Sequence, residues 1–174
     1  TRLVFVSSTP IEPAIIDYYL GLLPDVSHED ARRRLMLFSA SDASPQTLTQ
    51  KILERPRLLE RIRAAIGDRS AAHLTVFNST ACERTLAVRL DIPLYGCDPA
   101  LLEIGGKSGS RKAFRAAGIP LPDGAEDLRD TQDLAAALAD LKGRNPRLGR
   151  AVVKLNHGFS GEGNAVFSYA GCPE

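Results

Sequence analysis

Lys154 and the glycines that follow it are the residues of this chain best suited to hold an anion. Lys154 lies in residues 151–155, whose apolar side chains are typical of a buried strand, where an ammonium group is costly unless an anion meets it. Gly158, Gly161 and Gly163 come next and allow backbone N–H groups to approach a ligand closely. The phosphate chain of a nucleotide would satisfy both features.

The surroundings of these glycines exclude two familiar phosphate motifs. A Rossmann fingerprint or a Walker loop leads from a strand into a helix, whereas residues 165–169 predict a second strand. Residues 106–108 also fail the Walker pattern, because Leu101 stands where a glycine is needed. We therefore predict a mobile flap between two strands that closes over its ligand. The alternative is an ordinary hairpin whose lysine extends into solvent.

The composition disfavours several functional classes. The 174 residues are 44% hydrophobic and 25% charged, which is ordinary for a soluble globular protein. A net charge of +1 and an aromatic content of 6% argue against a nucleic-acid partner. No apolar run approaches the roughly 20 residues that span a bilayer. We expect a cytoplasmic protein without a membrane partner.

The cysteines and histidines predict no metal site. Cys82, Cys97 and Cys172 are odd in number and lack CxxC spacing, so we expect reduced packing residues. The histidines are scattered, and His157 is a candidate ligand contact only because it lies beside the glycines. We predict neither metal ligands nor catalytic residues within this chain.

Short apolar runs alternate with helical patterns, which predicts an α/β fold with a mostly parallel, Rossmann-like sheet covered by helices on both faces. Strands are expected at 3–6, 35–38, 73–77 and 92–95, and helices at 15–20, 28–34, 47–53, 56–66 and 81–90. Polar residues follow the strands at 7–9, 39–42 and 78–80, where α/β sheets bind ligands but where helix caps are also common. Both roles stay open.

The alternation of short strands and helices changes after Pro99. We therefore predict a first domain over residues 1–98 and a partial α+β lobe over residues 99–174. Helices are expected near 101–102, at 111–117 and at 133–142, before the strand that holds Lys154.

Two lysine motifs in this second part resemble the ATP-grasp superfamily. Lys107 precedes a helix that ends in Ala117-Gly-Ile-Pro-Leu-Pro122, and Lys154 precedes the glycine-rich segment. Residues 78–83, 95–99, 107–111 and 154–156 more narrowly resemble the pheganomycin-type peptide ligases. The resemblance covers nearly the whole chain. It implies a Rossmann-like pre-ATP-grasp domain followed by the first lobe of an ATP-grasp domain.

The resemblance implies an ATP-dependent ligase that joins a carboxylate to an amine through an acyl-phosphate. In such an enzyme the lysines neutralise phosphates, Lys154 also lies near the adenine, and the glycine-rich segment closes over the β- and γ-phosphates. Glu162 is expected to order the segment. The implied ATP-binding residues are Lys107, Lys154, Gly158, Phe159, Ser160, Gly161, Glu162 and Gly163.

The Mg²⁺ ligands, the acyl-phosphate arginine and the adenine hinge of the family lie downstream of the glycine-rich segment. We therefore expect this chain to be the N-terminal part of a ligase and to be inactive alone. Its expected cofactors are ATP and Mg²⁺, its partners are small-molecule or peptide carboxylates and amines, and a homo-oligomer is compatible. Two alternatives stay open: another ATP-grasp ligase, such as one making a D-Ala-D-Ala-like dipeptide, and a non-catalytic nucleotide-binding or scaffold module.

Overall fold

The computed structural model describes residues 1–158 and 162–171. The chain divides into two compact units, Thr1–Pro99 and Ala100–Glu174, and each is considered by itself. Both units combine helices with strands, so the predicted α/β class is confirmed. None of the described helices is long and apolar enough to cross a membrane.

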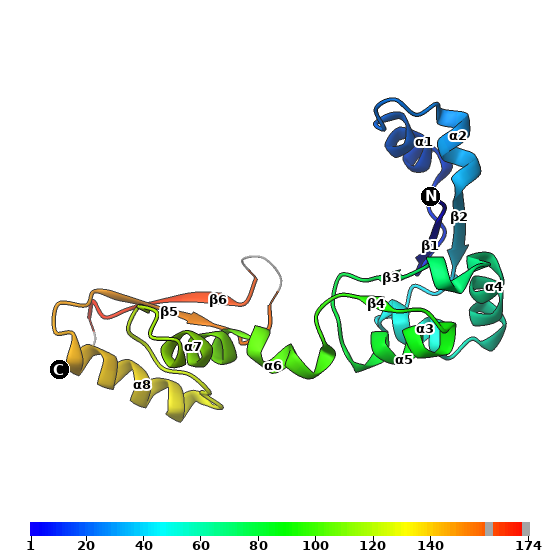
Figure 1. Cartoon of the computed structure of the whole chain (residues 1–174). Helices are drawn as coiled ribbons and strands as arrows, with labels where there is room; N and C mark the ends of the chain where they lie inside the picture. The colour runs from blue at the N-terminus through cyan, green and yellow to red at the C-terminus, as the bar shows by residue number, and fades with distance from the viewer. Residues whose placement is uncertain (159–161, 172–174) are drawn as a thin grey trace. The chain divides into compact units, whose positions relative to one another are not determined.

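The first unit alternates strands and helices along the chain (Figure 1). Its strands are β1 (Leu3–Ser7), β2 (Leu35–Ser39), β3 (Leu74–Thr75) and β4 (Leu94–Tyr95). Its helices are α1 (Pro13–Gly21), α2 (His28–Arg34), α3 (Leu48–Leu53), α4 (Pro56–Ile66) and α5 (Ala81–Leu90), with a short 3-10 turn η1 (Arg69–Ala71).

The strands of this unit form two parallel pairs. β1 pairs with β2 from Leu3 opposite Leu35 onward, and β3 pairs with β4. Parallel pairing was predicted, but the pairs form two separate two-stranded sheets among the described residues, not one sheet. The predicted extents 73–77 and 92–95 are wrong. Pro93 has no N–H to donate to a ladder, and it accepts a hydrogen bond from Leu74 N–H (2.8 Å) just before β4 begins.

Local capping signals set several helix ends where they were predicted. The Ser27 hydroxyl accepts a hydrogen bond from the Asp30 N–H (3.1 Å) at the start of α2. Thr80 and Glu83 form a capping box at the start of α5. α4 ends at Ile66 and is followed by Gly67, whose φ of 70° favours glycine. These ends depend only on nearby residues, which is why the sequence predicts them.

One apolar cluster holds the first unit together. Leu58 and Ile62 of the predicted α4 stripe are buried in it, while Leu59 and Ile66 pack at its edge. The other buried members are Ala40, Ile52, Leu86, Leu90 and Ile92, and Val4, Val6 and Phe38 pack against them.

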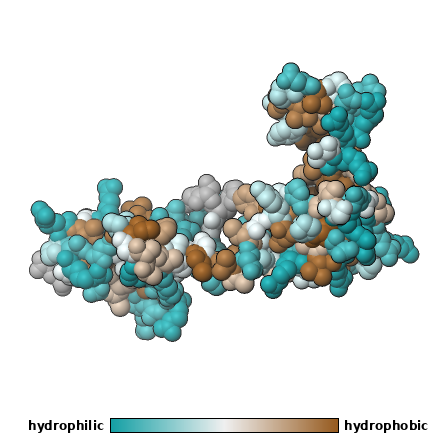
Figure 2. Space-filling view, viewed as in Figure 1, coloured by the Kyte–Doolittle hydropathy of each residue, from teal (hydrophilic) through white to brown (hydrophobic). Residues whose placement is uncertain are grey.

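Helix α1 lies outside this cluster and packs against α2. Ile16 is buried, but Tyr18 and Tyr19 are largely exposed, and Figure 2 shows apolar surface over this part of the unit. α1 therefore contributes little to the core.

The second unit is a hairpin with helices. It contains the helices α6 (Leu102–Gly105), α7 (Lys107–Ala116) and α8 (Thr131–Arg144) and the strands β5 (Arg150–Lys154) and β6 (Asn164–Ser168); a 3-10 turn η2 (Pro99–Leu101) spans the boundary. β5 and β6 pair antiparallel, with Lys154 opposite Asn164. The two predicted strands on either side of the glycine-rich segment are thus present.

Two helices of this unit start earlier than predicted. α7 begins at Lys107 and not at residue 111, and α8 begins at Thr131 and not at residue 133. The Asp130 carboxylate explains the second case, because it accepts hydrogen bonds from the N–H groups of Gln132 (2.9 Å) and Asp133 (2.8 Å). The first case depends on a residue far away in the sequence.

Candidate functional site

Lys107 lies beside the start of the glycine-rich segment. A Cβ atom built on Gly158 would be 3.8 Å from Lys107 Nζ and 2.9 Å from the carbonyl oxygen of Glu162. The second distance is too short for a real side chain, so Gly158 allows the two ends of the segment to approach each other. The fold therefore brings one predicted lysine to the predicted phosphate loop.

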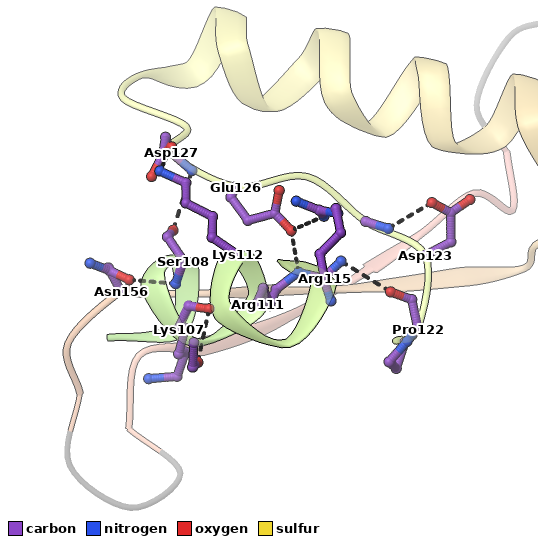
Figure 3. A network of polar contacts seen from close by, with 12 residues as sticks. Lys107, Ser108, Arg111, Lys112, Arg115, Pro122, Asp123, Glu126, Asp127 and Asn156 are labelled. Atoms are coloured by element: carbon purple, nitrogen blue, oxygen red, sulfur yellow. Dashed lines mark hydrogen bonds and ion pairs between the residues drawn. The ribbon is translucent and has the colours of Figure 1, made fainter. Parts of the chain in front are cut away.

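Asn156 connects the end of β5 to the start of α7 (Figure 3). Its carbonyl oxygen accepts a hydrogen bond from Lys107 N–H (3.2 Å), and its Oδ1 accepts one from Ser108 N–H (2.8 Å). The local cap residue, Gly106, has no side chain to do this. Asn156 thus satisfies N–H groups that a helix start leaves free, while the Lys107 ammonium lies beside Gly158.

Gly106 makes the contact with Asn156 sterically acceptable. A Cβ atom there would lie 3.0 Å from both Oδ1 and Nδ2 of Asn156 and 3.1 Å from Cε1 of His157. The Asn156 amide also lies 3.1 Å from Nε2 of His157, through its Nδ2. His157 therefore contacts the residues at the start of α7 as well as preceding the glycine-rich segment.

Lys154 lies on the exposed face of the hairpin. On the same face, Val152 is 58% exposed and its strand partner Val166 is 68% exposed. The prediction that Val152 and Leu155 lie in a buried strand is wrong, because two strands alone leave one face of the hairpin open to solvent. Burial consequently gives no reason for Lys154 to bind an anion. A cation beside apolar side chains nevertheless fits a nucleotide, which has a charged and an aromatic part.

The far end of the glycine-rich segment is fixed by Gly163. Its φ is 75°, and its carbonyl oxygen accepts a hydrogen bond from Leu155 N–H (2.9 Å). A Cβ atom there would be 2.7 Å from the Leu155 side chain. Glu162 is exposed. The predicted site residues Phe159, Ser160 and Gly161, and with them the prediction of a mobile flap, lie outside the described residues.

An acidic residue in the loop before α8 holds two arginines of α7, which sequence reasoning missed. Glu126 accepts hydrogen bonds from Arg111 Nε (2.6 Å) and Arg115 Nη2 (2.7 Å). The pKa of Glu126 lies below its usual value, chiefly because Arg115 donates a hydrogen bond to the carboxylate. Burial opposes this shift. The spacing of the two arginines, four residues apart on one helix face, was the available signal.

The adjacent Asp127 continues this network. Its N–H donates to the Ser108 hydroxyl (3.2 Å), and its carboxylate pairs with Lys112. Lys112 therefore has a structural partner on the surface, whereas Lys107 lies beside the glycine-rich segment.

The polar strand ends of the first unit are engaged in structural contacts. Lys51 is only 2% exposed, and its ammonium donates to Ser8 Oγ (3.2 Å) and to the carbonyl oxygens of Asp42 (2.8 Å) and Ser44 (2.7 Å). Hydrogen bonds from Ser44, and then the Arg55 guanidinium, hold the pKa of Asp42 at about 2. Sequence reasoning missed Lys51, since nothing local marks a lysine on α3 as buried.

The remaining strand end is used in the same way. Ser79 Oγ donates to the Cys97 carbonyl oxygen (2.7 Å), and Thr80 caps α5. The capping role is therefore observed at Thr80. Within residues 1–158 and 162–171, no group of three or more His, Cys, Asp or Glu side chains could hold a metal ion, and Cys82 and Cys97 are free thiols.

Comparisons with known proteins agree with the lysine motifs. Residues 101–170 match a family model described as IQCH-like, ATP-grasp. The chain is 30% identical over 161 residues to an L-propargylglycine–L-glutamate ligase of Streptantibioticus cattleyicolor, covering 90% of this chain and 33% of that protein. It is 27% identical over 180 residues to IQ motif-containing protein H of Danio rerio, covering 94% and 17%. No solved structure matches.

The chain spans about a third of the first relative and less of the second. The matched region contains α7 with Lys107 and the hairpin with Lys154. The comparisons therefore confirm the predicted resemblance to the ATP-grasp superfamily and agree with the resemblance to its pheganomycin-type peptide ligases.

Proposed function

We propose that this chain is the N-terminal, ATP-binding part of an ATP-dependent ligase that joins a carboxylate to an amine through an acyl-phosphate. The position of Lys107 beside Gly158, at the base of the hairpin that holds Lys154, supports this most directly. Two cations and the backbone of a glycine-rich segment on one small unit suit a polyphosphate. The ligase relative supports the reaction class.

In this proposal residues 99–174 form the first lobe of the ATP clamp and residues 1–98 form the pre-ATP-grasp domain. Lys107 and Lys154 would hold phosphate oxygens and neutralise their charge. Gly158, Glu162 and Gly163, with Phe159, Ser160 and Gly161, would cover the phosphates. ATP supplies the phosphoryl group that activates the carboxylate. The Mg²⁺ ligands and the groups that select both substrates would come from other parts of the natural protein.

A non-catalytic nucleotide-binding or scaffold module is the second candidate. It is favoured by the matching family model, which is IQCH-like, and by a relative whose name states no reaction. ADP release by the full-length natural protein, supplied with Mg²⁺ and amino acids, separates the two candidates. A protein that binds ATP and releases no ADP with any amino-acid pair would favour the second.

ATP titration of lysine variants tests the proposed binding site. In the full-length natural protein, Lys154→Ala should weaken ATP binding about tenfold, which corresponds to about 1.4 kcal/mol, because a charge opposite the phosphates is lost. Lys112→Ala is the matched control, since the Lys112 side chain is 55% exposed and pairs with Asp127. Isothermal calorimetry measures both. Equal affinities of the two variants would remove Lys154 from the site.

A further inference from the structure

We propose that Asn156 is a positioning residue that fixes Lys107 for phosphate binding, an inference that rests on the proposed function. Asn156 lies two residues after Lys154, at the point where β5 leads into the glycine-rich segment. Through its backbone and its side chain it holds the first two N–H groups of α7. One residue thus joins the element that holds Lys107 to the element that holds Lys154.

The contact determines where α7 begins. Helices need their first N–H groups satisfied, and the residue before α7 is Gly106, which offers no side-chain acceptor. Asn156 supplies that acceptor from 48 positions away. Without it the first turn of α7 would fray, and Lys107 is the first residue of that turn.

The same contact sets the direction of the Lys107 side chain. Lys107 is half-buried, and its ammonium lies beside Gly158, two residues beyond the cap. Asn156 also lies against Gly106, where any side chain would displace it. Because Asn156 and Gly158 belong to one short stretch, a shift of the cap would separate Lys107 from the glycine-rich segment.

A double-mutant cycle in the full-length natural protein tests the inference. Asn156→Ala should weaken ATP binding about fivefold to tenfold when Lys107 is present. In the Lys107→Ala background the same change should cost less than about twofold, because residues that act through one another are not additive. Independent losses that multiply would overturn the inference, since they would show that Asn156 affects ATP binding without acting through Lys107.

Asn145→Ala is the matched control. Asn145 is also half-buried in the second unit, and its amide donates to Asp123 Oδ2 (2.7 Å) and to the Leu141 carbonyl oxygen (3.3 Å), at the end of α8. This variant loses comparable hydrogen bonds and should leave ATP affinity within about twofold. A loss equal to that of Asn156→Ala would overturn the inference.

A second variant covers the case in which Asn156→Ala does not fold. Asn156→Gln keeps the amide but moves its acceptor by one methylene, and it should give the same non-additive cycle with Lys107→Ala. Wild-type protein that binds no ATP would overturn both the proposed function and this inference. Wild-type protein that binds ATP, with multiplicative losses in the cycle, would overturn only the role of Asn156.

Discussion

The two units of this protein are stabilised by different kinds of contact. In the first unit, apolar side chains such as Ile52, Leu86 and Leu90 are buried between α3, α4 and α5. In the described part of the second unit, the helices and strands contain no buried side chain. Its helix α7 is held by ion pairs with Glu126 and Asp127 and by the Asn156 cap.

This difference arises because the first unit buries apolar side chains, whereas the hairpin of the second unit leaves apolar side chains exposed. A fully buried aliphatic side chain stabilises a fold by about 1.5–3 kcal/mol, whereas an exposed ion pair contributes about 0.2–1 kcal/mol. Val152 and Val166 lie on the open face of the hairpin beside Lys154 and leave that face accessible. The unit that buries less apolar surface is therefore the one that presents both lysines of the proposed site.

The largest expected effect contrasts a core residue with a hairpin residue. Leu86 is 3% exposed, so Leu86→Ala should lower the free energy of unfolding of the first unit by about 3 kcal/mol, because it leaves a cavity. Val152→Ala should cost the second unit less than about 1 kcal/mol, since that side chain is already largely solvated. Hydrogen exchange of the α5 and β5 amides measures each unit. Equal losses would contradict the contrast.

An intermediate effect is expected when a buried lysine is compared with a half-buried one. Lys51→Met should destabilise the first unit by about 2 kcal/mol, because it leaves the part-buried acceptors of Ser8, Asp42 and Ser44 without the donor that Lys51 supplies.

Lys142 provides the matched control in the second unit. Its ammonium also donates to two carbonyl oxygens, those of Pro146 (2.9 Å) and Leu148 (2.9 Å), but Lys142 is half-buried and Pro146 is exposed, so water reaches this contact more easily than that of Lys51. Lys142→Met should therefore cost less than about 1 kcal/mol. Urea unfolding curves of both variants check this. A larger loss for Lys142→Met would show that polar contacts matter more in the second unit.

The smallest expected effect is a pH dependence in the first unit. The pKa of Asp42 is lowered from 3.8 to about 2, so its ionised form favours the folded state. That contribution is complete above pH 3.8 and is lost as the pH falls through about 2. Asp42→Asn should therefore destabilise the protein near neutral pH, and its difference from wild type should shrink in acid. Urea midpoints measured from about pH 6 to 2 would contradict this if the difference stayed constant.

The sequence by itself determined the features that depend on neighbouring residues. α4 runs from Pro56 to Ile66 and is followed by the positive-φ Gly67, and α5 begins at Ala81, both as predicted. The hairpin around the glycines follows from strand-forming residues on either side of a break. The two lysine motifs also gave the ATP-grasp resemblance, which the family model confirms. The roles of the individual site residues stay predictions.

Only the tertiary structure decided the features that depend on distant partners. α7 starts at Lys107 because the Asn156 side chain, 48 positions after Ser108, accepts a hydrogen bond from the Ser108 N–H. Lys51 is buried because Ser8, 43 positions earlier, and two nearby carbonyl oxygens offer acceptors in one place. Val152 is exposed although its strand is apolar, because exposure depends on what covers a face and not on the residues that form it. Local patterns encode backbone conformation, whereas burial and long-range capping arise only when the chain brings separate segments together.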